Sequence, residues 1–213
     1  PAVLADALHD RAHLCHLRKD FASAVRYGYS ALEFAPDALA RERILADIAA
    51  AFAELGHMSA ARDAHIVVAA TTQETWLRHQ TLVNLIYIAI QERQEPAFHG
   101  YRMQLVNENL QPYMKGYFHL YSARGYRTFG QVARAEAEYH AAITVGADHN
   151  LSQLQITAEM EMEQLAKQPV EVADPVLAAP ELAQPWTPEL EKIAVAIGDL
   201  RELTLTAQKI GTA

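Results

Sequence analysis

Apolar residues recur at helical spacing along most of the chain, in paired stretches that short turns separate. The first pair covers residues 3–17 and 21–34, and Pro36 ends the second stretch because proline cannot continue a helix. In later turns, Gly56 suits the left-handed position after a helix and Pro96 suits the first turn of a helix. The pattern predicts a series of antiparallel helical hairpins.

The hairpins repeat with a period of 37 residues, because a shift of that length superimposes small residues on small residues. Four units result, and the third keeps the phase but carries Phe98 where its neighbours have alanine. Small residues at these positions let neighbouring helices approach closely. The aligned sets are Ala12, Ala49, Ile86 and Ala123; Ala24, Ala61, Phe98 and Ala135; and Ala31, Val68, Leu105 and Ala142. The turn positions Lys19, Gly56, Arg93 and Gly130 align in the same way.

The unit resembles a tetratricopeptide repeat over residues 4–146. In the first unit, the small–small–proline pattern of that family is carried by Ala12, Ala24, Ala31 and Pro36, with Phe21 at the aromatic position. In the fourth unit it is carried by Ala123, Val132, Ala135 and Ala142. The resemblance implies an all-α fold, a right-handed superhelix of four hairpins (an α-solenoid), whose first helices line a concave groove.

The remainder of the chain divides into three parts. Residues 150–168 predict a ninth helix that caps the stack, with Asp148 or Asn150 at its start. Residues 169–188 hold five prolines and predict an extended linker. Residues 189–213 predict an amphipathic helix capped by Thr187. We therefore expect a repeat domain over 1–168, a linker over 169–188 and a C-terminal helix over 189–213.

The C-terminal helix carries an apolar stripe that needs a surface to cover it. The stripe consists of Leu190, Ile193, Ala194, Ile197, Leu200 and Thr204. We expect the helix to dock on the repeats of its own chain or of a neighbour. If it fills the groove, it acts as an autoinhibitor or as the arm of a homodimer. The plainer alternative is a mobile tail.

Composition narrows the range of functions. The chain has 213 residues, 51% of them apolar, and a net charge of -8, which disfavours a protein that binds nucleic acid through its phosphates. The single cysteine cannot form an internal disulfide, and no apolar run is long enough to span a membrane. With no signal-peptide pattern, we expect a cytoplasmic protein that binds neither nucleic acid nor membrane.

The sequence predicts no enzyme and no cofactor. It has no phosphate-binding loop, glycine-rich dinucleotide turn or serine nucleophile elbow, and its HxxxH pair lacks the adjacent glutamate of a zinc protease. The aromatic and basic run over 113–129 could stack on bases, but packing is the more common use of such residues. We expect Phe118 and Phe129 to point inward and the tyrosines to lie at the rims.

The segment HDRAHLCH at 9–16 raises the question of a metal site. His9, His13 and His16 form one stripe of a helix, together with Asp6. These side chains span about 15 Å along the axis, so they cannot all converge on one ion. His9 and His13 could share an ion, but they need ligands from elsewhere in the chain. We expect no metal, and prefer one wall of a peptide groove over a solvated histidine face.

The 37-residue phase extends this stripe to the other units. The candidate partner-binding residues are His9, His13, His16, Arg43, Tyr87, Tyr117, Arg124 and Arg127. The middle of the expected groove is small and apolar and contains Tyr87. Its far end has Tyr117, together with Arg124 and Arg127, which offer a site for a carboxylate of the partner. The alternative is that these arginines pair with acids on neighbouring helices or face water.

Two functions follow from the sequence. The first is a protein–protein interaction scaffold that binds a peptide or a partner segment in the concave groove. The alternative is the sensor or effector domain of a larger bacterial transcriptional regulator, since regulators with arrays resembling this one bind signalling peptides or partner proteins.

Overall fold

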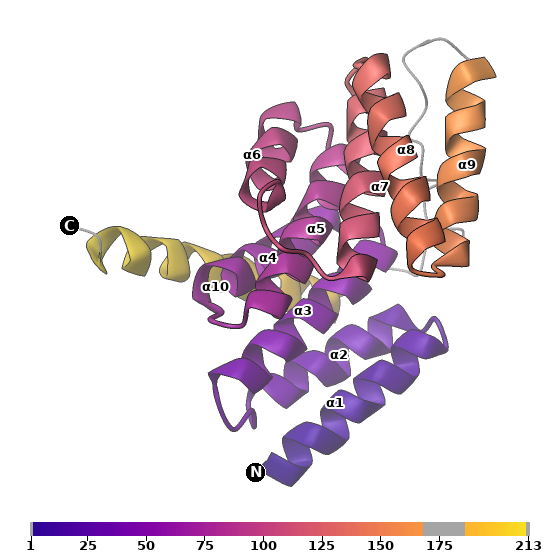
Figure 1. Ribbon diagram of the computed structural model, residues 1–213. Helices are drawn as coiled ribbons and strands as arrows, with labels where there is room; N and C mark the ends of the chain where they lie inside the picture. Colours follow the sequence, from indigo (N-terminus) through magenta and orange to yellow (C-terminus); the bar gives the residue numbers. More distant parts are fainter. Residues whose placement is uncertain (1, 168–185, 212–213) are drawn as a thin grey trace. The chain divides into compact units, whose positions relative to one another are not determined.

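The computed structural model describes residues 2–167 and 186–211, and all regular structure in these ranges is helical. The all-α prediction is therefore confirmed. Most of the loops that join the helices are short. The helices are α1 (Ala2–Leu17), α2 (Phe21–Leu32), α3 (Ala38–Glu54), α4 (Met58–Thr71), α5 (Thr75–Gln91), α6 (Glu95–Leu105), α7 (Pro112–Thr128), α8 (Val132–Asp148), α9 (Ser152–Lys167) and α10 (Pro188–Gly211). Figure 1 shows their order along the chain.

The backbone angles of the turns repeat with the period of 37 residues. Lys19, Gly56, Arg93 and Gly130, each 37 residues after the last, all adopt positive φ angles between 53° and 80°. After each of them, the next backbone N–H donates to a carbonyl five residues earlier, as from Asp20 to Cys15. This is the hydrogen bond that closes a helix with a left-handed end. The four hairpin turns therefore share one geometry, although only two of them have the glycine that favours it.

The described chain forms two compact units. The first comprises residues up to 81 together with the C-terminal helix α10, and the second begins at residue 82. The boundary lies within α5. In the first unit, α1 packs on α2, α2 on α3 and α3 on α4. In the second, α7 packs on α8 and α8 on α9, and Figure 1 shows these three helices side by side.

Helix α10 docks on its own chain, as one of the sequence alternatives predicted. It contacts α4 and α2, which are the second helices of the first two hairpins, and therefore does not cover the first-helix stripe of this unit. Leu190, Ile193 and Ile197 of the predicted stripe are buried. Leu200 joins the core cluster around Leu45. The apolar stripe is thus covered by the chain that carries it.

Polar contacts fix α10 at its start and near its middle. The Arg201 guanidinium donates to Asp63 of α4 over 2.8 Å, and Arg26 of α2 lies 2.7 Å from Glu189. Just before the helix, the ring of Trp186 packs against the ring of His57, with centroids 3.7 Å apart and a tilt of 44°. The Thr187 hydroxyl accepts from the backbone N–H of Leu190, so the predicted cap is confirmed.

Close packing in the second unit explains the large residue in the third repeat. Phe98 of α6 is fully buried, and a Cβ atom added to Gly125 of α7 would lie 2.1 Å from its ring. The glycine therefore makes the space that the phenylalanine fills. Phe118 is buried as predicted, and the half-buried Phe129 packs 5.5 Å from Phe98.

The start of α9 differs from the sequence prediction. The helix begins at Ser152, Asp148 is the last residue of α8, and Asn150 has a φ angle of 56° in the turn between them. Neither residue caps α9, because the chain uses a left-handed turn there, in which Leu151 donates to Gly146. The predicted apolar face is present, with Leu154 and Leu165 buried.

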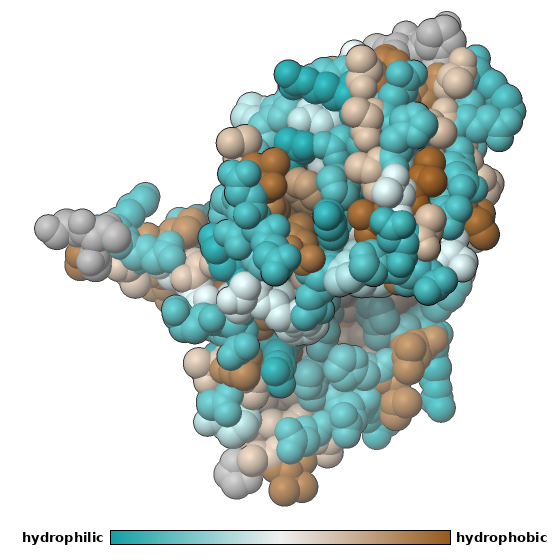
Figure 2. Space-filling view, in the orientation of Figure 1, coloured by the Kyte–Doolittle hydropathy of each residue, from teal (hydrophilic) through white to brown (hydrophobic). Residues whose placement is uncertain are grey.

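One prediction concerns residues that lie mostly outside the described ranges. The predicted linker at 169–188 lies there except for its last three residues, 186–188. Within the described residues, no helix has both the length and the apolarity needed to cross a membrane. Figure 2 shows hydrophilic and hydrophobic side chains interspersed on the face in view.

Candidate functional sites on the first helices

The first helices of neighbouring repeats are joined by polar bridges between residues 37 or 38 positions apart. In the first unit the bridge runs from His9 of α1 to Asp47 of α3. In the second unit it runs from Arg124 of α7 to Glu161 of α9. Second helices are bridged in the same manner, since Arg102 of α6 binds Glu138 of α8. At these three junctions, the repeat therefore places equivalent surfaces next to each other and lets a polar pair form between them.

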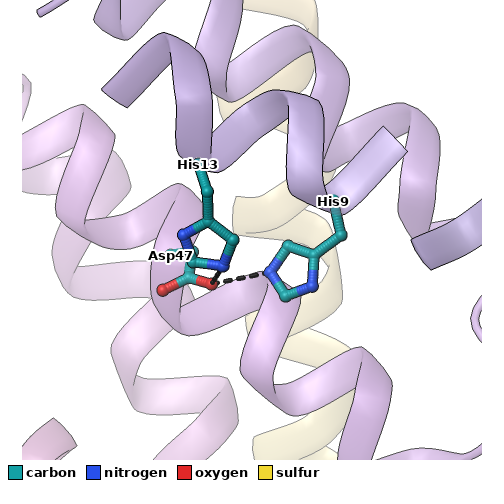
Figure 3. Close-up of side chains that lie close together, drawn as sticks. All are labelled: His9, His13 and Asp47. Carbon is teal, nitrogen blue, oxygen red and sulfur yellow. Dashed lines mark hydrogen bonds and ion pairs between the residues drawn. The ribbon is translucent and has the colours of Figure 1, made fainter. Parts of the chain in front are cut away.

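The histidine stripe of the sequence meets a carboxylate of the next repeat. His9 and His13 are one turn apart on α1, and their ring centroids are 4.5 Å apart. The Nε2 atom of His9 lies 2.7 Å from the Oδ2 atom of Asp47, and the Nε2 atom of His13 lies 3.2 Å from the same oxygen. Figure 3 shows both rings directed at this carboxylate. The side chains of the three residues are 23%, 52% and 44% exposed, so solvent reaches the cluster.

A small pocket adjoins this cluster. It has a volume of about 90 Å³ and is lined by His13, His16, Asp47, Ile48, Gly28 and three alanines. His16 does not join the cluster and packs edge-on against Phe21 at 5.1 Å. Arg43, the candidate from α3, is exposed one turn before Asp47. Of the predicted residues in this unit, the structure thus brings together His9 and His13.

A buried histidine is close enough to Asp47 to sense its charge. His65 of α4 is 1% exposed, and its Nδ1 atom has no hydrogen-bond partner. Burial lowers the pKa of His65 to about 4, against a smaller opposite contribution from the charge of Asp47. The side chain is therefore neutral near neutral pH.

In the second unit, four tyrosines form a continuous row. The rings of Tyr87 and Tyr121 are 5.4 Å apart, those of Tyr121 and Tyr117 are 5.6 Å apart, and those of Tyr117 and Tyr113 are 4.8 Å apart. Tyr113 is 61% exposed, whereas Tyr117 and Tyr121 are half-buried. Burial raises the pKa of Tyr121, which keeps its hydroxyl protonated. The row therefore begins among packed helices and ends in solvent.

The two candidate arginines have different surroundings. Arg124 is buried and donates to both carboxylate oxygens of Glu161, over 2.9 Å from Nε and 2.5 Å from Nη2. Burial alone would lower the pKa of Arg124, but the hydrogen bonds and the charge of Glu161 raise it. Arg124 thus follows the alternative of a pair with a neighbouring helix. Arg127 is half-buried, and its Nη1 atom is buried without a hydrogen-bond partner.

Sequence reasoning did not include Asp47, Glu161 or Tyr121 among the candidate partner-binding residues. Glu161 follows Arg124 by 37 residues, so extending the repeat phase one unit further would have found it. Asp47 lies one residue away from the α3 position that the 37-residue period assigns to the stripe. A search restricted to that period therefore does not find it, because His9 and Asp47 are 38 residues apart. Comparison of the chain with protein-family models, curated proteins and solved structures finds no match.

Proposed function

We propose that the chain is a protein-interaction module, an α-solenoid of the tetratricopeptide type, that binds a segment of a partner protein along its first helices. The tyrosine row on α5 and α7 carries this proposal. Tyrosine offers a large, rigid surface with a polar end and loses little conformational entropy on binding, which is why protein interfaces are enriched in it. A row of contacting, mutually tilted rings that ends in solvent at Tyr113 suits an apolar or aromatic side chain of a partner.

The charges beside the row indicate what else the partner segment carries. Arg124 is already satisfied by Glu161 and serves to hold Tyr121, whose ring lies 5.5 Å from its guanidinium carbon. Arg127, three residues further along α7, has a buried nitrogen with no partner in the described structure. Buried donors are normally hydrogen-bonded, and a carboxylate is the strongest acceptor for a guanidinium. The segment therefore combines an apolar residue with an acidic one.

Site-specific photocrosslinking tests this proposal and identifies the partner. A photoreactive phenylalanine analogue at position 113, at the exposed end of the row, is expected to capture a partner segment from an extract of the source organism. The same analogue at Tyr29, which is exposed on α2 of the other unit, is the control and should not capture it. The captured segment is mapped by mass spectrometry and synthesised as a peptide.

The dissociation constant of that peptide then decides the outcome. Tyr117→Ala and Arg127→Met are each expected to raise Kd at least about tenfold, because central aromatic and arginine side chains dominate binding energies. Tyr29→Ala should leave Kd unchanged. If the peptide binds Tyr117→Ala and Arg127→Met as tightly as the unmodified protein, or if position 113 captures nothing, the binding surface lies elsewhere and the proposal fails.

A further inference from the structure

We propose that His9, His13 and Asp47 form a binding site for a divalent transition-metal ion of the Zn²⁺ class, which joins α1 to α3. The sequence left open where further ligands for a His9–His13 pair would come from. The next repeat supplies Asp47 (Figure 3). One ligand atom from each residue lies within 4.8 Å of the other two.

The geometry is close to that of a metal site. Bonds of about 2.0–2.1 Å to histidine nitrogen and carboxylate oxygen place tetrahedral ligands about 3.3 Å from one another. The two nitrogen–oxygen distances are 2.7 and 3.2 Å. Small side-chain rotations are therefore enough to admit an ion, while the two helices stay in place. The histidines stand four residues apart on one helix, and this spacing brings both rings to the same side.

The ligand set selects the class of ion. Imidazole nitrogen suits Zn²⁺, Co²⁺, Ni²⁺ and Fe²⁺, whereas Ca²⁺ and Mg²⁺ prefer sites made of oxygen alone. Each ring can offer the Nε2 lone pair while Nδ1 carries the proton. Two histidines and one carboxylate leave at least one coordination position to water, as in metal sites with three protein ligands. The half-exposed His13 gives the ion a path from solvent, and the 90 Å³ pocket shares His13 and Asp47 with the site.

Metal titration of the tag-free, full-length protein tests the site. After dialysis against a chelator, Zn²⁺ is added in a calorimeter and Co²⁺ is followed by its visible absorption bands. We expect one equivalent of either ion to bind with a Kd in the micromolar range or below. His9→Ala, His13→Ala and Asp47→Asn are each expected to raise Kd at least tenfold.

His16→Ala is the matched control, because His16 lies on the same helix and lines the same pocket but is not one of the three ligands. It should bind the ion as the unmodified protein does. The absence of saturable binding at one equivalent would overturn the proposal, and so would an equal loss in His16→Ala. If Asp47→Asn keeps the full affinity, the ion sits on the histidine pair alone, and the three-residue site is wrong.

Thermal unfolding gives a second readout, which depends neither on the heat of Zn²⁺ binding nor on the visible absorption of Co²⁺. An ion that binds only the folded state raises Tm in proportion to the logarithm of its concentration over Kd. At Zn²⁺ concentrations near the Kd of the unmodified protein, the ion should therefore raise Tm in that protein and in His16→Ala, and should raise Tm of Asp47→Asn much less. A Tm that rises equally in Asp47→Asn contradicts the site.

Discussion

The first-helix stripes of the two units use equivalent positions for different chemistry. His13 on α1 and Arg124 on α7 occupy the same place in the repeat, three repeats apart, and each meets a carboxylate from the next first helix. In the second unit, Arg124 and Glu161 are 9% and 13% exposed, and two nitrogens meet two oxygens. In the first unit, two imidazoles meet one oxygen, and solvent reaches all three side chains.

The difference shows how one scaffold provides both a structural joint and an exchangeable site. A guanidinium has five donors and no lone pair to give to a metal, so a buried Arg–Glu bridge can only hold helices together. An imidazole can donate, accept or bind an ion, and an exposed imidazole cluster contributes little to stability when it is empty. The residue type at one repeat position thus decides between rigidity and ligand exchange.

The largest effect that separates the two stripes is expected from breaking the buried bridge. Glu161→Ala leaves Arg124 as a buried charge without its partner, which typically costs about 3–5 kcal/mol in the free energy of unfolding. Glu161 also accepts from the hydroxyl of Tyr139, which loses that acceptor as well. Hydrogen exchange of amides in α7, α8 and α9 measures the loss.

The matched control removes both charges. Arg124→Met combined with Glu161→Leu replaces the buried pair by apolar side chains and should recover most of the lost stability. Hydrogen exchange is the readout for this bridge because both tryptophans, Trp76 and Trp186, belong to the first unit, where their fluorescence reports unfolding. If Glu161→Ala costs less than about 1 kcal/mol in hydrogen exchange, the bridge behaves as an ordinary surface pair and the contrast between the stripes is lost.

The sequence predicted the fold better than it predicted the site. Helical spacing and the 37-residue shift located the hairpins, because apolar periodicity and turn chemistry are local properties. The turns at Lys19 and Arg93 share the left-handed geometry of Gly56 and Gly130, and alignment of the repeats anticipated this equivalence where residue preference alone would not. The space that Gly125 leaves for Phe98 depends on contact between two helices, which no local pattern specifies.

The site depended on contacts between repeats, and these are sensitive to small offsets. The stripe rule placed His9, His13 and Arg124 on first helices correctly, but it did not name the residue that each of them contacts. Asp47 was missed because it stands one position away from the expected stripe of α3, and a helix turns by about 100° per residue. The docking of α10 on second helices was one alternative among several, because an amphipathic stripe specifies that a helix is covered but not by which surface.

A second difference between the units is their response to acid. His65 binds a proton near pH 6.5 in the unfolded chain but only near pH 4 in the folded one. Between these values the unfolded state holds more protons, so stability of the first unit is full above about pH 6.5 and falls by about 3 kcal/mol as the pH approaches 4. Urea unfolding followed by tryptophan fluorescence, with a chelator present, measures this slope.

The second unit should respond at lower pH. Burial acts to raise the pKa of Glu138, but hydrogen bonds from His119 and Arg102 outweigh it and lower this pKa below its ordinary value of 4.5. The stability that Glu138 contributes is therefore present above about pH 4.5 and lost only as the pH falls further.

His65→Leu should flatten the slope of the first unit, whereas His140→Gln, at an exposed position of α8, should leave it unchanged. A slope that survives in His65→Leu assigns it to another group.

The smallest effect is expected from the metal-free histidine cluster itself. Asp47→Asn in the presence of a chelator removes the negative charge that both histidines face, yet all three side chains are partly solvated, so the cost should stay below about 1 kcal/mol. Urea unfolding followed by tryptophan fluorescence is the measurement. This small value beside the large one for Glu161→Ala would separate the two stripes by energy as well as by geometry. A cost near 3 kcal/mol for Asp47→Asn would instead make the cluster a structural joint like the Arg124–Glu161 bridge, because so large a loss requires that Asp47 holds α1 and α3 together without any ion.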